Sequence, residues 1–105
     1  MDITPVVEEK AYIIDAHASQ IYEWLPWINR NNDSIPQTQE GKIEYILREY
    51  VLKRGEIKEK DRPVVEKWYE NRAKEVKTIE AFEICEFGRT VNDQDIRELF
   101  PIFHK

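Results

Sequence analysis

The sequence has very few of the residues that build covalent cross-links and common metal sites. It contains one cysteine, Cys85, and two histidines, His17 and His104. A lone cysteine excludes an internal disulfide and any zinc site made of several cysteines, and the histidines lack the His-Glu-x-x-His spacing of a metal-binding helix. We therefore expect no cofactor and no metal, and we interpret Cys85 as a small apolar side chain of the core.

Glycine is also scarce, and long apolar runs are missing. The three glycines form neither a G-x-G nor a Walker-type phosphate loop, and there is no G-x-S-x-G nucleophile elbow. Without a phosphate loop, a triad or a metal cluster, we expect that the protein is not an enzyme. No run approaches the roughly 20 apolar residues of a membrane helix, and no signal-peptide pattern is visible. Together with the single cysteine, this predicts a cytoplasmic protein that does not bind membranes.

Charged residues and aromatic rings are plentiful. The 105 residues are 41% hydrophobic and 35% charged, which is typical of one folded domain spanning residues 1–105. The net charge of −5 is uneven: residues 1–41 carry seven acids and two bases, residues 42–78 eleven bases and eight acids, and residues 79–105 six acids and three bases. Such a chain is a poor non-specific ligand of nucleic acid, whereas complementary charge would speed its encounter with a basic protein.

The first half of the chain predicts two helices. Residues 12–14 form a short apolar run that fits either a strand or the start of a helix. In the helix that follows, Pro26 should cause a kink or break near Leu25, because proline lacks a backbone donor and clashes with the preceding turn. The second helix begins at a Thr38 cap and stops at Gly55. The predicted inward-facing residues are Ile21, Trp24, Leu25 and Ile28, then Ile43, Ile46, Leu47 and Tyr50.

The second half predicts two more helices. The third, over residues 63–78, follows an Asp61 cap, and Asn92 caps the last. Residues 80–87 fit either a continuing helix or a strand that pairs with residues 12–14. The predicted inward-facing residues are Val65, Trp68, Tyr69, Ala73, Val76 and Ile79, then Ile96, Leu99, Phe100 and Phe103. The sequence thus predicts a small, mainly α domain of about four helices, with a minor two-stranded β element as an option.

One string in the third helix resembles the recognition helix of homeodomains. Residues 64–74 share the pattern Val-x-x-Trp-Phe-x-Asn-Arg, with tyrosine in place of phenylalanine. The resemblance implies that Asn71 reads an adenine edge and that Trp68 anchors the core. However, no second helix of the required length fits before it, no basic N-terminal arm is present, and Glu70 would face the groove at a specificity position, where DNA phosphates repel its charge. A DNA-binding transcriptional regulator that uses the 63–78 helix is therefore our alternative hypothesis.

Four apolar or aromatic side chains exceed what a simple helical bundle needs. Tyr45 and Leu52 lie opposite the apolar stripe of the second helix, Trp27 lies at the edge of the inward face of the first helix, and Tyr22 lies further round. Tyrosine and tryptophan contribute much of the binding energy at protein interfaces. We therefore assign these four as partner-binding residues, and burial inside the domain is the other interpretation.

These features predict a small acidic protein for protein–protein interaction, such as an inhibitor, an adaptor or an antitoxin-like regulator. It would bind a basic surface of a partner protein, which could itself bind nucleic acid, and aromatic side chains would anchor the contact. By analogy of size and charge, an anti-defence protein of a virus or mobile element, acting in the host cytoplasm, fits this description. We also expect a homodimer as an option, because it would account for a second helix that is apolar on two sides.

Overall fold

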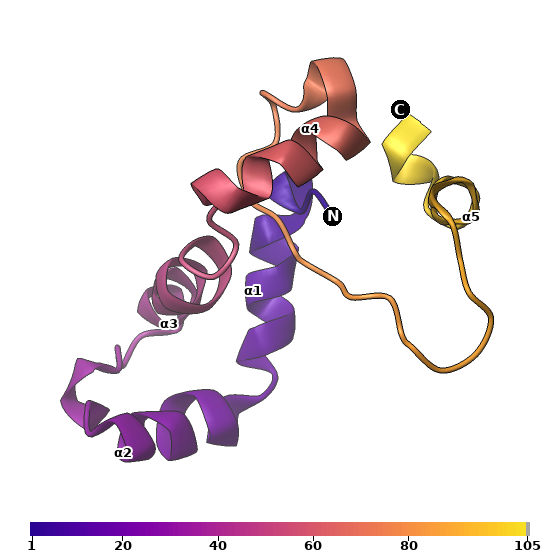
Figure 1. Ribbon diagram of the computed structural model, residues 1–105. Helices are drawn as coiled ribbons and strands as arrows, with labels where there is room; N and C mark the ends of the chain where they lie inside the picture. Colours follow the sequence, from indigo (N-terminus) through magenta and orange to yellow (C-terminus); the bar gives the residue numbers. More distant parts are fainter. Residues whose placement is uncertain (105) are drawn as a thin grey trace.

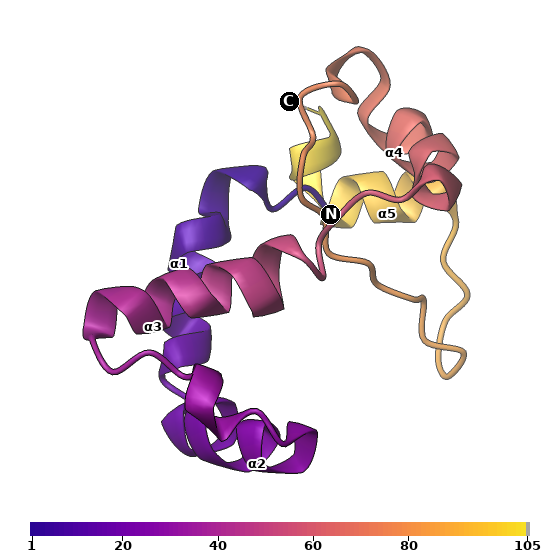
Figure 2. The same ribbon diagram turned by 90° about the vertical axis from the view of Figure 1, so that its left-hand side faces the viewer.

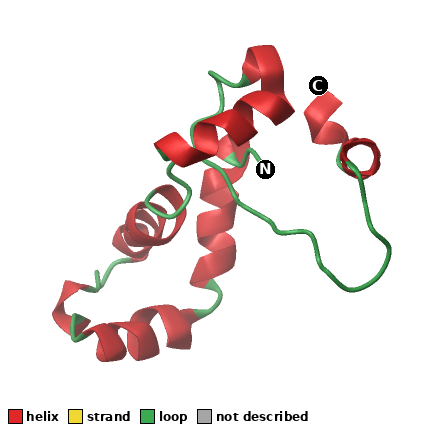
Figure 3. Ribbon diagram, in the orientation of Figure 1, coloured by secondary structure: helices red, strands yellow, loops and turns green. Residues whose placement is uncertain are grey.

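The computed structural model describes residues 1–104, and these are mainly helical, as predicted (Figures 1 and 3). Five α-helices are joined by short 3₁₀ and π turns, and the described residues contain isolated β-bridges but no strand. The α-helices are α1 (Val7–Asp15), α2 (Leu25–Asn29), α3 (Gln39–Ile46), α4 (Arg62–Tyr69) and α5 (Asp93–Leu99). The turns are η1 (Thr4–Val6), η2 (Gln20–Trp24), η3 (Asn32–Ser34), η4 (Leu47–Leu52), η5 (Glu59–Asp61), η6 (Glu70–Arg72) and η7 (Pro101–His104).

The first apolar core lies where α1 packs against α3 and η4. Residues 12–14, which fitted either a strand or a helix, belong to α1, and Ala11 on its inner face is fully buried. Ile43 and Ile46 of the predicted second helix are buried, as expected from their spacing. The buried members of this N-terminal core are Ile3, Ala11, Ile21, Ile43, Tyr45, Ile46 and Val51.

The predicted break near Leu25 does not occur, because Trp24 and Leu25 keep helical backbone angles and only the type of helix changes there. A wider π turn, η2, gives way to α2 at Leu25, one residue before the proline. Pro26 itself is fully buried. The expected inward face is only partly correct, because Trp24 and Ile28 are exposed. With Pro26 and Ile21 taking the inner positions, these two side chains are left on the outer surface.

The predicted second helix forms as α3 followed by η4, and its two end signals act as expected. The Thr38 hydroxyl oxygen accepts a hydrogen bond of 3.1 Å from the backbone N–H of Gly41. At the other end, the N–H of Gly55 donates to the carbonyl of Val51 at 2.9 Å. Gly55 then contacts Thr78 so closely that a Cβ on the glycine would lie 2.4 Å from the threonine methyl group. The chain therefore passes directly from this helix into contact with residues 78–79.

Residues 78–79 form the only β pairing within the described residues, which is a correction to the predicted β element. Ile79 bridges to Asp2, and Thr78 bridges to Glu56, both in antiparallel orientation. Residues 80–87 form neither a helix nor a strand and do not pair with residues 12–14, which are helical. Asp2, near the N-terminus, thus pairs with this part of the chain, whereas the sequence suggested residues 12–14 as the pairing partner.

The predicted 63–78 helix is wrong beyond residue 69. α4 ends at Tyr69, because Glu70 adopts a left-handed φ of 50° that cannot continue the helix. Asp61 lies at the start of α4, but its carboxylate accepts the N–H of Lys58 instead of capping the helix. A second buried cluster consists of Val65, Tyr69 and Val76, against which Ile57, Trp68, Ala73, Ile79 and Phe103 pack.

The C-terminal part of the chain is attached through an exposed connector. Residues 81–90 are all exposed, including Cys85, so our interpretation of this cysteine as a core side chain is wrong. As predicted, the Asn92 side chain caps α5 and accepts the N–H groups of Gln94 and Asp95 at 2.8 and 3.0 Å. Leu99 and Phe100 are exposed, contrary to expectation. Figure 2 shows the connector running away from the molecule before α5 returns beside α4.

The molecule is extended for its length. Its radius of gyration is 16.7 Å, whereas a compact domain of about 100 residues has a value near 13 Å. Its accessible surface is 8409 Å², whereas the surface of a compact monomer of 12.7 kDa is about 6,200 Å². Two separate apolar clusters and an exposed connector account for this large surface.

Candidate protein-binding surface

Two tryptophans and an isoleucine form an exposed apolar patch at the end of the molecule that carries α2. Trp24 is 56% exposed, Trp27 is 69% exposed, and Ile28 is also exposed. Trp27 and Ile28 follow Trp24 by three and four residues, so each neighbours Trp24 on the outer surface of the η2–α2 helix. We call Trp24, Trp27 and Ile28 the tryptophan patch. Of the four predicted partner-binding residues, only Trp27 belongs to it.

The local fold explains why these side chains point outward. Pro26 lies between the tryptophans and is buried, so the opposite side of this short helix carries Trp24 and Trp27. α2 stops at Arg30, which has a left-handed φ of 55°. The N–H of Asn31 donates to the Pro26 carbonyl at 3.0 Å and closes the helix end. The chain then turns back through η3, which brings Asn32 and Asp33 beside the patch.

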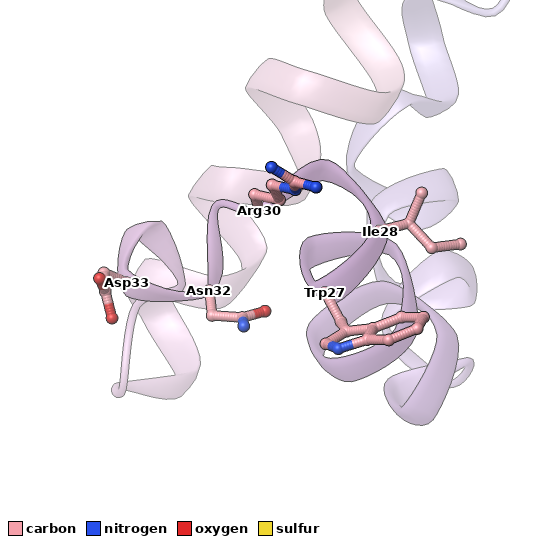
Figure 4. Close-up of a pocket in the computed structure, with 5 residues that line it drawn as sticks. All are labelled: Trp27, Ile28, Arg30, Asn32 and Asp33. Atoms are coloured by element: carbon pink, nitrogen blue, oxygen red, sulfur yellow. The ribbon is translucent and has the colours of Figure 1, made fainter.

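Two shallow depressions meet at Trp27 and Asn32. The first has a volume of about 690 Å³ and the second about 530 Å³. Figure 4 shows the Asn32 side chain pointing toward the Trp27 indole, while Ile28 and Asp33 point away on opposite sides. The first is lined by Trp27, Ile28, Arg30, Asn32 and Asp33, and the second by Ser19, Gln20, Glu23, Trp24, Trp27 and Asn32. The surface therefore offers broad aromatic contact area with amide and carboxylate groups at its border.

The charge around the tryptophan patch is mainly negative. Glu23 and Asp33 border the depressions, with Arg30 as the base among the lining residues. Residues 1–52, which hold most of the N-terminal core, carry nine acids and four bases. We call residues 1–52 the acidic lobe. Its negative charge, together with the aromatic patch, complements a basic protein surface.

Tyr22 is engaged within the molecule. Its hydroxyl donates to a carboxylate oxygen of Asp15, whose other oxygen accepts from the Gln39 amide at 2.8 Å. The Lys42 ammonium lies 4.8 Å from the centre of the Tyr22 ring. Burial, together with the hydrogen bond to Asp15, raises the pKa of Tyr22. These contacts join α1, η2 and α3, so Tyr22 holds the helices together beneath the surface.

Tyr45 and Leu52 lie apart from the patch and from each other. Tyr45 is only 5% exposed and meets Tyr50 edge-to-face with ring centres 5.8 Å apart. Burial and the hydrogen bond with Tyr50 raise the pKa of Tyr45 to about 12. Leu52 is exposed at the end of η4. The four predicted residues thus do not form one surface, and Tyr45 is a core residue that cannot contact a partner.

The sequence reading assigned Trp24 and Ile28 to the core and so missed most of the patch. The burial of Pro26 between the two tryptophans leaves them outside, and the sequence carried no signal of that burial. Elsewhere, Asn71 of the homeodomain-like string lies in η6, after the end of α4. Trp68 packs against the second apolar cluster, as its anchor role implied.

Other kinds of site are not evident in the described part of the chain. Residues 1–104 bring together no group of three or more histidine, cysteine, aspartate or glutamate side chains that could hold a metal ion. Within the same residues, every helix is too short or too polar to cross a bilayer. The chain matches no protein-family model, no curated protein and no solved structure.

Proposed function

We propose that this chain is a small acidic interaction protein that binds a basic surface of a partner protein through the tryptophan patch. In this role it acts as an inhibitor, an adaptor or an antitoxin-like regulator in the cytoplasm, not as an enzyme. The observation that carries the proposal is the exposure of Trp24 and Trp27 side by side, at 56% and 69%. Aromatic side chains that become buried on binding dominate the energy of many protein interfaces. Two exposed indoles in the unbound protein are therefore candidates for such a role.

Charge supports a basic partner. The acidic lobe around the patch would attract a positive surface over a distance of several ångströms and speed the encounter. This long-range attraction is screened by salt, with a Debye length of about 8 Å at physiological ionic strength. The association rate should therefore fall as salt rises, while the dissociation rate should depend mainly on the two tryptophans.

The test is to capture a partner with the immobilised chain, identify it, and measure its affinity for purified variants. Trp27→Ala should raise the Kd about 30-fold or more, which corresponds to a loss of about 2 kcal/mol at an interface anchor. Phe82→Ala is the matched control, because Phe82 is also 69% exposed but lies in the connector far along the chain from the patch.

Three results would contradict the proposal. In the first, Trp27→Ala and Phe82→Ala bind the partner with equal affinity, which would place the interface elsewhere. In the second, the association rate is the same at low and high salt, which would remove the role of the acidic lobe. A partner that proves to be a second copy of the chain would also overturn the assignment to a basic protein.

A further inference from the structure

The C-terminal residues 92–104, which we call the C-terminal arm, contact the outer side of α4 and η6. The Phe103 ring stacks at 5.0 Å from the Trp68 ring and meets the Tyr69 ring edge-on at 5.4 Å. The Arg72 guanidinium donates to the carbonyl of Ile102 at 3.0 Å. The Lys67 ammonium pairs with the Asp93 carboxylate at 2.5 Å. We call Lys67, Trp68, Tyr69 and Arg72 the α4 shelf.

The contacts of the arm lie mostly near solvent, and Arg97 makes several of them. Its guanidinium donates to the carbonyl of Lys67 at 3.2 Å, pairs with the Glu70 carboxylate at 3.7 Å and lies 5.1 Å from the centre of the Trp68 ring. None of the residues of α5 is fully buried, and Leu99 and Phe100 remain exposed even with the arm in place. The ion pair between Lys67 and Asp93 is more than half exposed on both sides, where such pairs contribute little to stability. The arm is therefore held by Phe103, which packs against the second apolar cluster, and by the polar contacts of Arg97 and Arg72.

The connector is long and open enough to let the arm move away from the shelf. Residues 81–90 are all exposed, and Gly88 adopts a φ of 108° in open space. At about 3.3 Å per extended residue, a connector of this length lets the arm move tens of ångströms from the shelf. Opening of the arm would break the ring contacts of Phe103 and the hydrogen bonds of Arg72 and Arg97, but it would expose no fully buried residue of α5.

The arm and the segment that carries the shelf have opposite net charge, and their ion pairs are Lys67 with Asp93 and Glu70 with Arg97. Residues 53–79 carry nine bases and six acids, and residues 92–104 carry three acids and one arginine. The arm thus shows which chemistry the shelf accepts: an aromatic ring on Trp68, a carboxylate on Lys67 and a backbone carbonyl on Arg72. An acidic helix with a phenylalanine near its end supplies all three groups.

We propose that the α4 shelf is a binding site for an acidic, phenylalanine-bearing helix of a partner protein, and that the C-terminal arm covers it as a displaceable intramolecular ligand. The shelf belongs to the basic middle of the chain, whereas the tryptophan patch belongs to the acidic N-terminal part. The inference is therefore independent of the proposed function, and each fails or stands on its own experiment. If both hold, the chain joins a basic partner to an acidic one.

The experiment uses a fluorescent synthetic peptide with the sequence of residues 92–104 as the probe for the shelf. The full chain should bind the peptide weakly, because its own arm competes at a high effective concentration. Phe103→Ala in the full chain weakens the arm and should lower the Kd for the peptide at least tenfold. Leu99→Ala is the matched control, because Leu99 lies on the arm but is exposed, and it should leave the Kd at the wild-type value.

A second variant and a second measurement keep the proposal falsifiable. Adding Lys67→Glu to Phe103→Ala should raise the Kd for the acidic peptide again at least tenfold, since Lys67 is half exposed and its replacement should not unfold α4. Hydrogen exchange of the α5 amides should be faster in Phe103→Ala than in wild type. Equal peptide affinity in wild type and Phe103→Ala, no effect of Lys67→Glu, or unchanged exchange in α5 would each overturn the proposal.

Discussion

The phenolic oxygen of Tyr69 accepts a hydrogen bond of 2.5 Å from the backbone N–H of Asp2, 67 positions away in the chain. Asp2 also bridges to Ile79, so the N-terminal residues are held between α4 and the segment that follows it. Ile3 lies in the N-terminal core, while Tyr69 lies in the second apolar cluster. This hydrogen bond, the bridge from Asp2 to Ile79 and the hydrogen bond from the Ile3 N–H to the Thr78 carbonyl together connect the two clusters.

Tyr69→Phe should lower the free energy of unfolding by about 1 kcal/mol, because it leaves the partly buried N–H of Asp2 without an acceptor. Urea unfolding followed by tryptophan fluorescence measures the change. Tyr12→Phe is the control, since Tyr12 is exposed on α1 and should leave the unfolding midpoint in place. Equal midpoints for all three proteins would show that this hydrogen bond does not stabilise the fold.

Ile46 and Ile13 offer a matched pair for testing the N-terminal core. Ile46 is 0% exposed and Ile13 is 66% exposed. Ile46→Ala should cost about 2–5 kcal/mol, because it removes buried methyl groups and leaves a cavity, whereas Ile13→Ala should cost no more than about 0.5 kcal/mol. Thermal unfolding followed by circular dichroism compares the two. A similar loss in both variants would mean that α1 buries its outer face as well.

Gly55 should tolerate no side chain. An alanine Cβ at this position would lie 2.4 Å from the Thr78 methyl group and 3.0 Å from the Ile79 carbonyl oxygen. Gly55→Ala should therefore destabilise the protein by about 1–3 kcal/mol, as expected for overpacking at a contact with backbone. Adding Thr78→Ser, which removes that methyl group, should recover part of the loss. Urea midpoints of the single and double variants provide the check, and no recovery would point to the backbone contact alone.

Stability should decline in alkaline solution. The pKa of Tyr45 is raised to about 12 by burial and by its hydrogen bond with Tyr50, whereas an unfolded tyrosine ionises near pH 10. The folded state thus binds the proton more tightly, so the contribution of Tyr45 is complete below about pH 10 and is lost as the pH rises to about 12.

Unfolding free energies measured across this pH range, with absorbance at 295 nm to follow phenolate formation, test the decline. Tyr45→Phe should show a shallower decline, because phenylalanine cannot ionise. Some decline should persist, since burial and Asp15 also raise the pKa of Tyr22. Identical slopes in wild type and Tyr45→Phe would show that Tyr45 ionises equally easily in both states.

The elements that the sequence predicted well are those with a capping or stop residue next to the helix end. Thr38 and Gly55 bound the predicted second helix, and Asn92 starts the last one, because a cap satisfies backbone groups within a few residues of itself. The early end of α4 had no such local signal. Apolar residues continue at helical spacing to Ile79, but residues 78–79 pair with Asp2 and Glu56 instead. Those partners lie more than 20 positions away, so spacing alone could not reveal them.

The candidate surface was predictable only in part, for a similar reason. Trp27 was identified from its place on a helical wheel, and it is exposed. Tyr45 and Leu52 looked equivalent on the same wheel, yet Tyr45 is buried and Leu52 is exposed. A wheel gives directions around one helix axis, but α1 packs against α3 and η4 and decides which direction is covered. The exposure of Trp24 likewise depended on Pro26 taking the inner position.

The extended shape has a practical consequence for anyone who purifies this protein. With principal extents of 47, 33 and 23 Å, a single copy tumbles and diffuses like a larger sphere. It should leave a gel-filtration column ahead of a spherical standard of 12.7 kDa, in the region where a small dimer would elute. Elution volume alone would therefore overstate the number of subunits, and a mass from light scattering or sedimentation equilibrium is needed to count them.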